Sequence, residues 1–87
     1  MARQLVGYAQ YVFPSLKASE LLAVLMRKPL NYQVERQRGS HRKLTSPAGY
    51  PDLWFSFHDG VTVPPGAVKK ILTKDVGLSE QDALALV

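Results

Sequence analysis

Three segments between Tyr32 and His58 alternate apolar and polar residues with a period of two, and this alternation constrains the fold more than any other feature. Successive side chains of a β-strand point to opposite faces, so each segment separates its apolar residues from its polar ones. Gly39-Ser40 divides the first two segments and predicts a tight hairpin turn, because glycine adopts a positive φ freely. The pattern therefore predicts a three-stranded antiparallel sheet.

The two faces of the predicted sheet differ in their chemistry. One face is apolar and carries Tyr32, Val34, Leu44, Leu53, Phe55 and Phe57. The other face is polar apart from one indole ring and carries His41, Lys43, Thr45, Trp54, Ser56 and His58. Only the apolar face needs cover, so all helices are expected to pack on that side.

The segment before the sheet has the spacing of a helix. We predict a helix from near Leu16 to Pro29, with Ser15 as its cap and with apolar residues at Leu21, Leu22, Leu25 and Met26. Proline cannot continue a helix, and Asn31 behind it tolerates the left-handed region that a turn into a strand requires.

The segment after the sheet predicts two more helices. Pro64-Pro65-Gly66 introduces the first, which has an apolar stripe at Val68, Ile71 and Leu72 and ends at Gly77. Ser79 opens a short C-terminal helix from Gln81 to Leu86. The fold class is therefore α+β, in the order helix, three-stranded antiparallel sheet, helix, with a short third helix at the end. Residues 16–87 form a single domain, and residues 1–15 form an extension that is either an edge strand or a flexible arm.

Charge is concentrated in one part of this chain of 87 residues with a net charge of +4. The segment 27–43 holds six basic residues and one acid, whereas 75–87 holds three acids and no base. The sequence has no cysteine, which excludes disulfides and thiolate metal sites. It also lacks a run of ~20 apolar residues and a recognisable signal peptide, so we expect a cytoplasmic protein.

The hairpin between the first two predicted strands is cationic. Its basic residues are Arg36, Arg38, Arg42 and Lys43, and Glu35 is the one acid beside them. Such a ribbon suits a phosphate backbone, with Lys69 and Lys70 as further candidate contacts. The alternative is a solvated surface, because exposed strands often use Lys and Arg to discourage pairing at a sheet edge.

His41 lies in the middle of the cationic hairpin and is the candidate catalytic residue, because an imidazole both accepts and donates a proton near neutral pH. A structural histidine is the alternative. His58 and Ser40 are auxiliary candidates, and for His58 an RNA contact or a supporting role competes with catalysis. Two histidines without a carboxylate pair or cysteine fall short of a zinc site, so we predict neither a metal nor another cofactor.

The stretch Arg36-Gln37-x-Gly39-Ser40-His41 resembles the HicA family of bacterial toxins, small ribonucleases with a fold like the double-stranded RNA-binding domain. The resemblance extends over about 16–84 and includes 17–22 (KASELL), Phe57-His58 and 66–72 (GAVKKIL). In that family the histidine of Gly-Ser-His is catalytic, which implies this role for His41. A cognate antitoxin, HicB, inhibits the toxin.

The prediction is therefore a toxin that cleaves single-stranded mRNA as a metal-independent endoribonuclease, through His41. The resemblance implies a HicB-like antitoxin as partner, with the toxin monomeric alone and hetero-oligomeric in the complex. Trp54 could stack on an RNA base, anchor the antitoxin or be partly buried. Two rival functions remain, a non-catalytic module that binds double-stranded RNA and an interaction protein whose open sheet face docks a partner. A pure RNA binder needs cations but no titratable group between them.

Overall fold

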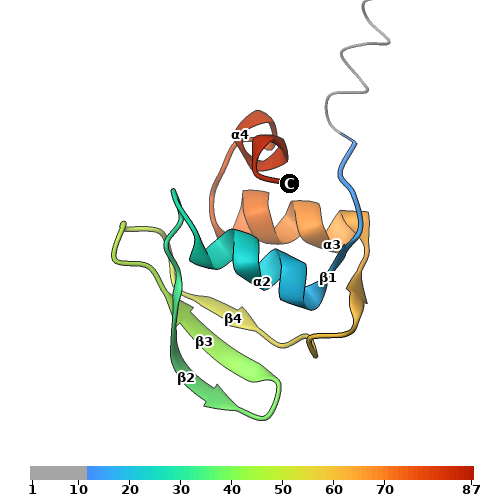
Figure 1. Cartoon of the computed structure of the whole chain (residues 1–87). Coiled ribbons are helices and arrows are strands. Elements are labelled where there is room, and N and C mark those ends of the chain that lie inside the picture. The colour runs from blue at the N-terminus through green and yellow to red at the C-terminus, as the bar shows by residue number, and fades with distance from the viewer. Residues whose placement is uncertain (1–11) are drawn as a thin grey trace, which may run out of the picture.

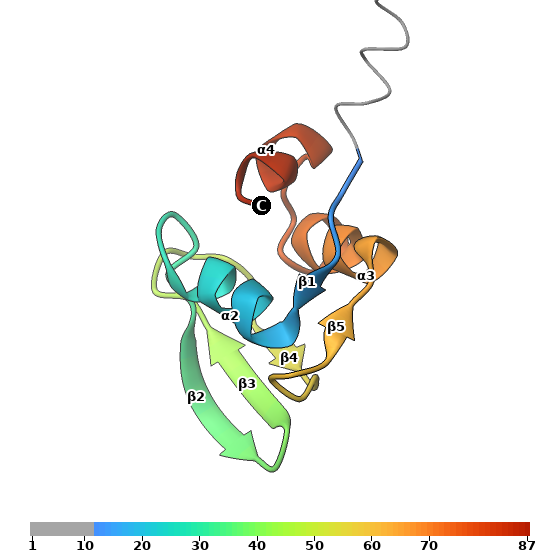
Figure 2. The same ribbon diagram turned by 45° about the vertical axis from the view of Figure 1, so that its right-hand side comes forward.

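The computed structural model describes residues 12–87 and confirms the α+β class (Figure 1). Its elements are, in chain order, β1 (Leu16–Lys17), α2 (Ala18–Met26), β2 (Gln33–Arg38), β3 (His41–Thr45), β4 (Leu53–Phe55), β5 (Thr62–Val63), α3 (Pro65–Lys70), the π-helical turn η1 (Ile71–Asp75) and α4 (Glu80–Ala85). Both α2 and α3 lie on one side of the larger sheet, and the β2–β3 hairpin extends beyond them (Figures 1 and 2). Among the described residues, every helix is too short or too polar to span a membrane.

The larger sheet has the predicted topology, with strands in the order β2-β3-β4 and antiparallel pairing throughout. A two-residue turn joins β2 to β3, and Gly39 has a φ of +60° there. Positive φ at the first central residue alone is the mark of a type II′ turn, which follows the right-handed twist of the strands. The turn therefore sets the register in which Arg38 pairs with His41 and Gln37 with Arg42.

A second, two-stranded sheet lies outside the prediction. Leu16–Lys17 pairs antiparallel with Thr62–Val63, so the predicted start of the first helix near Leu16 is wrong. Helix α2 begins at Ala18 instead, so its N-cap is Lys17 and not the predicted Ser15. The Lys17 backbone N–H donates to Glu20 Oε1 at 2.8 Å. Because Leu16 and Lys17 pair as a strand, the helix and its N-cap begin later in the chain than predicted.

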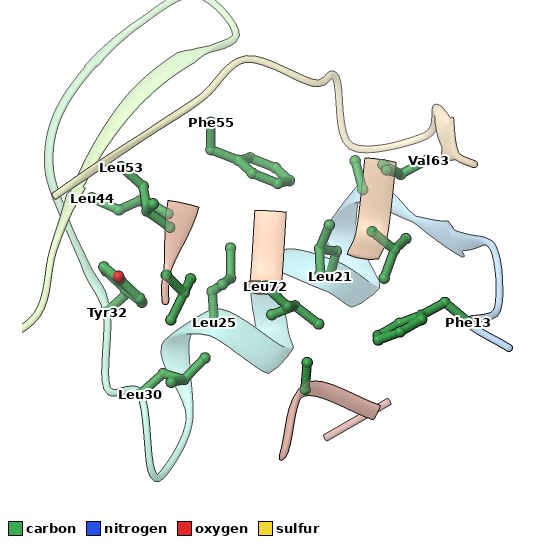
Figure 3. Close-up of a cluster of buried hydrophobic side chains, with 14 residues drawn as sticks. Phe13, Leu21, Leu25, Leu30, Tyr32, Leu44, Leu53, Phe55, Val63 and Leu72 are labelled. Atoms are coloured by element: carbon green, nitrogen blue, oxygen red, sulfur yellow. The ribbon is translucent and has the colours of Figure 1, made fainter. Parts of the chain in front are cut away.

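The core forms between the apolar sheet face and the helices, as predicted (Figure 3). It combines Leu44, Leu53 and Phe55 from the sheet and Tyr32 before it with Leu21 and Leu25 from α2, and with Val68 and Leu72 from α3 and η1. Phe13 is also buried in this cluster, although it belongs to the predicted extension 1–15. Residues 1–11 of that extension, predicted as an edge strand or arm, fall outside the described residues.

Two predictions for the apolar face need correction. Val34 pairs with Leu44 but is 38% exposed, because β2 is an edge strand and its register shifts between Val34 and Arg36. Phe57 packs against the core while only partly buried, and it lies beyond β4, which ends at Phe55. The third predicted strand is thus shorter than its alternation suggests.

Three residues that were predicted to turn the chain or to end or begin a helix do so in the structure. Asn31 has a φ of +54° and turns the chain after α2 into β2. Gly77, with a φ of +94°, ends the helical segment 65–75, and the Leu78 N–H donates to the Leu72 carbonyl at 3.1 Å. Ser79 Oγ accepts from the Asp82 N–H at 3.1 Å and opens the C-terminal helix α4.

Candidate functional site

The polar face of the β2-β3-β4 sheet carries two rows of side chains that run across the strands. One row consists of Arg36, Lys43 and Trp54, because Lys43 pairs with both of the others. The next row consists of Arg38, its partner His41, and Ser56, which contacts the imidazole. We call these six side chains the open face. Helices α2 and α3 lie on the other side of the sheet (Figure 2).

His41 is the first residue of β3, directly after the hairpin turn, and its side chain is exposed. Its Nδ1 lies 3.3 Å from Ser56 Oγ, at the long end of hydrogen-bond distances. Within the described part of the chain, Nε2 makes no hydrogen bond. The imidazole is therefore held through one nitrogen and presents the other to solvent, as a proton-transfer group requires.

A hollow of about 570 Å³ lies beside His41 and is lined by Arg36, Gln37, Arg38, His41 and Trp54. Its size falls in the range of small-ligand sites, roughly 300–1,000 Å³. The Arg36 guanidinium carbon lies 5.8 Å from the centroid of the Trp54 ring, a cation–π distance. The Gln37 side-chain amide donates to the Gly39 carbonyl at 3.0 Å and so supports the turn next to His41.

The charge of the open face is positive but uneven. Lys43 Nζ lies 3.3 Å from Glu35 and 4.0 Å from Asp52, so two carboxylates partly compensate it. Among residues 12–87, Arg36 and Arg38 form no ion pair, and both are exposed. The uncompensated charge therefore lies on the two arginines that line the hollow with His41.

Arg42 lies on the covered side of the sheet, apart from the other hairpin cations that we predicted to hold phosphates. Its side chain is only 11% exposed, and Nη2 donates to Asp59 Oδ1 at 2.8 Å. Nη1 is buried and finds no acceptor among the described residues. Alternation along β3 explains the placement, because Arg42 and Leu44 point to one face while His41 and Lys43 point to the other.

The loop that holds Asp59 also accepts hydrogen bonds from the N-terminus of α2. Its backbone carbonyls at Asp59 and Val61 accept the N–H groups of Ser19 and Ala18 at 3.1 and 2.8 Å. These donors belong to the first turn of the helix, where N–H groups lack intrahelical partners. Through Asp59, Arg42 thus connects the sheet to the loop that contacts the N-terminus of α2.

Four other candidates also do not line the hollow. Lys69 and Lys70 are on α3, in the helix layer, where Lys69 pairs with Glu80 and Lys70 with Asp75, each at 3.4 Å. His58 is exposed in the loop after β4 and does not line the hollow. Ser40 occupies the second position of the turn, next to His41 in the chain.

Ser56 and Gln37 are site residues for which the sequence predicted no role. Ser56 follows Trp54 at a spacing of two, so the alternation already placed it on the face of His41. Its contact with the imidazole depends on the relation between strands, which periodicity within one strand does not reveal. Nothing in the sequence pattern indicated that Gln37 would support the turn.

The donor set of the open face favours anions over metal cations. Residues 12–87 contain no group of three His, Cys, Asp or Glu side chains that could hold a metal ion. Two arginines and a lysine beside one imidazole instead provide charge-assisted donors, which bind phosphate oxygens well. An exposed proton-transfer group surrounded by such donors is an arrangement that can act on a phosphodiester.

Comparison with known proteins identifies the family. The family model described as HicA toxin of bacterial toxin-antitoxin matches residues 18–78, which is more than half of the chain and includes the whole β2-β3-β4 sheet. No curated protein and no solved structure matches the chain. The resemblance that the Gly-Ser-His stretch indicated is thus confirmed at the level of the family. The chain belongs to the HicA toxins of bacterial toxin–antitoxin systems.

Proposed function

We propose that this toxin is an endoribonuclease that cleaves single-stranded mRNA through His41. The observation that carries the proposal is the exposed imidazole at the edge of a hollow whose other walls include Arg36 and Arg38, two arginines that form no ion pair within residues 12–87. Chemistry at phosphorus needs a proton-transfer group and a means of stabilising negative charge, and the hollow brings both together.

The mechanism uses the substrate's own nucleophile. The 2′-oxygen attacks the adjacent phosphorus, the bond from phosphorus to the 5′-oxygen breaks, and the products carry a 2′,3′-cyclic phosphate and a 5′-hydroxyl. His41 Nε2 either removes the 2′-hydroxyl proton or protonates the departing 5′-oxygen, and water handles the other proton. Arg36 and Arg38 stabilise the charge on the phosphoryl oxygens. A single imidazole of this kind contributes typically 10²- to 10⁴-fold.

The partner is an antitoxin, as membership of a toxin–antitoxin family implies. We propose a HicB-like protein that covers the open face with acidic and apolar side chains, because that face combines cations with an exposed indole. Covering His41 would block access of RNA directly. The free toxin acts as a monomer in the cytoplasm, where its mRNA substrate is found.

The test compares the two histidines of the chain. Purified wild type, His41→Ala and His58→Ala are incubated with end-labelled single-stranded RNA, with and without EDTA. We expect His41→Ala to lose about 10²- to 10⁴-fold in cleavage rate with an unchanged circular dichroism spectrum. His58→Ala is the matched control, since its ring is exposed outside the hollow, and it should cleave within a few-fold of wild type. Cleavage should survive EDTA.

A single 2′-deoxy sugar at the scissile position tests the nucleophile. Such a substrate should bind nearly as well as RNA and resist cleavage. A folded His41→Ala variant that still cleaves would remove His41 from the mechanism. If wild type binds double-stranded RNA and cleaves none, the chain is the non-catalytic module. Cleavage of the deoxy substrate or a strict magnesium requirement would contradict the metal-independent route.

A further inference from the structure

Trp54 is exposed at the centre of β4 although both of its neighbours in the strand are buried. Its relative exposure is 62%, against 6% for Leu53 and 2% for Phe55. A large aromatic ring in water on a polar sheet face contributes nothing to the core. Exposed aromatic rings on sheets act in many RNA-binding folds as platforms on which an unpaired base stacks.

The guanidinium of Arg36 places a positive charge beside this ring and does not stack closely on it. Its guanidinium carbon lies 5.8 Å from the ring centroid, close to the outer limit of about 6 Å for a cation–π contact. The flexible arginine can therefore move to admit a flat group onto the indole and can then pair with a phosphate attached to that group. An indole beside a mobile cation suits a nucleotide, which has a flat base and an anionic phosphate.

The register sets the distance from this platform to the catalytic imidazole. Trp54 lies in the row of Lys43, and His41 lies in the neighbouring row, two residues before Lys43 in β3. Two residues of an antiparallel strand span roughly 6.8 Å and adjacent strands lie roughly 4.8 Å apart, so the backbone positions of Trp54 and His41 are roughly 8 Å apart. A base on Trp54 and a phosphate at His41 are thus separated by about the length of one extended nucleotide, and both positions belong to one hollow.

We propose that the hollow binds one unpaired nucleotide, whose base stacks on Trp54 and which directly flanks the phosphate at which His41 promotes cleavage. This inference rests on the proposed ribonuclease function and specifies its substrate. RNA must be single-stranded at that nucleotide, because a base inside a duplex is stacked on both sides and offers no free face. An RNA base fits better than a protein side chain, because Arg36 and Arg38, which have no ion-pair partner in the described part of the chain, supply two positive charges for the adjacent phosphates.

The ring itself reports binding, because Trp54 is the one tryptophan of the chain. We would titrate the His41→Ala protein, which should cut about 10²- to 10⁴-fold more slowly, with a single-stranded oligoribonucleotide and with the same sequence as a duplex. Stacking should quench the indole fluorescence with the single strand, and the duplex should leave it unchanged. A salt-matched titration with polyphosphate controls for charge alone and should not quench.

Two substitutions separate the aromatic ring from its apolar bulk. Trp54→Leu should weaken binding of the single strand by about 5- to 140-fold, the range expected for loss of one stacked base. Trp54→Phe retains a ring and should recover most of that loss. Met26→Ala, which truncates another exposed apolar side chain on α2, is the matched control and should bind like the parent protein.

Cleavage by the wild type maps the platform on the substrate. In a series of oligonucleotides with one abasic position each, only the abasic site that flanks the cut should slow cleavage strongly. Cleavage by Trp54→Leu at the wild-type rate, equal cleavage of the duplex, or a flat abasic series would each overturn the platform while leaving the ribonuclease in place. Quenching without any cleavage would instead overturn the ribonuclease and keep the platform. Loss of antitoxin binding by Trp54→Leu with RNA binding intact would assign the ring to the protein partner.

Discussion

The two faces of the β2-β3-β4 sheet come from alternate residues of the same strands and differ in almost every property. Leu44 of β3 pairs with Leu53 of β4, and both are buried. The neighbouring pair, Lys43 and Trp54, faces solvent. The covered face is held by packing and has little tolerance for change. The open face carries exposed charges and one ring, and its residues are available for binding.

This difference shows that the position of a residue in the alternation matters more than its chemical type. Arg38 and Arg42 are both hairpin arginines, yet Arg38 borders the hollow and Arg42 is bound to Asp59 on the covered side. Composition makes them equivalent contributors to a cationic ribbon. Because side chains alternate between the two faces of a sheet, Arg38 lies at the candidate site and Arg42 on the covered face.

The largest effect should come from breaking the covered face and sparing the open one. Phe55→Ala removes a ring that is 2% exposed and should lower the free energy of unfolding by about 3–5 kcal/mol. Trp54→Ala, one residue away, should cost about 1 kcal/mol or less, since its ring is exposed. Urea denaturation followed by circular dichroism measures both. Equal losses would mean that the open face is packed against something in the folded protein.

Much of this contrast was predictable, because it follows from local rules. The period of two placed Leu44, Leu53 and Phe55 on the covered face, and the glycine at the hairpin turn set the register. Asn31 was likewise recognisable, because few residues other than glycine tolerate its positive φ. These signals act within a few residues of one another, which is the range that a sequence pattern can report.

Several of the missed features depend on contacts between distant parts of the chain. The pairing of Leu16–Lys17 with Thr62–Val63 involves segments too short for any periodicity. Arg42 and Asp59 are separated by 17 positions, and Ser56 and His41 by 15. Lys69 and Lys70 stay predicted RNA contacts, and the structure places them beside Glu80 and Asp75 in the helix layer. Sequence indicated which groups exist but not which of them are already paired.

A smaller effect should appear at the edge of the covered face when the pH is raised. Burial, followed by the Asp52 carboxylate, raises the pKa of Tyr32 to about 12 from the usual value of 10.0. The phenol also donates to the Pro51 carbonyl at 2.6 Å. Because the folded-state pKa lies above the unfolded one, the stabilisation is complete below pH ~10 and is lost as the pH rises towards ~12.

The corresponding experiment compares wild type with Tyr32→Phe. At neutral pH the variant should be about 1 kcal/mol less stable, because the hydrogen bond is lost. Between pH 10 and 12 wild type alone should lose a further ~2–3 kcal/mol, so the order of stability reverses. Denaturation curves at each pH give the difference, and the lysines shared by both proteins cancel. Parallel curves for the two proteins would show that the phenol ionises as easily in the folded state as in the unfolded one.

The two hairpin arginines allow the faces to be compared through RNA affinity. Arg38→Ala should reduce the slope of log affinity against log salt by about 0.7, the value for one phosphate contact on a single strand. Arg42→Ala should leave that slope unchanged, since the guanidinium already pairs with Asp59 away from the hollow. Filter binding at several salt concentrations, with the His41→Ala protein as background, measures both. A reduced slope for Arg42→Ala would mean that its ion pair opens when RNA binds.

The smallest effect concerns a single contact on the open face, that between His41 Nδ1 and Ser56 Oγ at 3.3 Å. In the proposed mechanism the hydroxyl orients the imidazole so that Nε2 faces the RNA, and a neutral hydrogen bond of this kind contributes roughly 0.5–1.5 kcal/mol. Ser56→Ala should therefore slow cleavage by about 2- to 10-fold at saturating RNA, with affinity little changed. Ser56→Thr retains the hydroxyl and should restore the rate. The nitrogen-15 shifts of the His41 ring should show a single tautomer in wild type and a mixture in Ser56→Ala. An unchanged tautomer in Ser56→Ala would assign the orientation of the imidazole to the hairpin backbone alone.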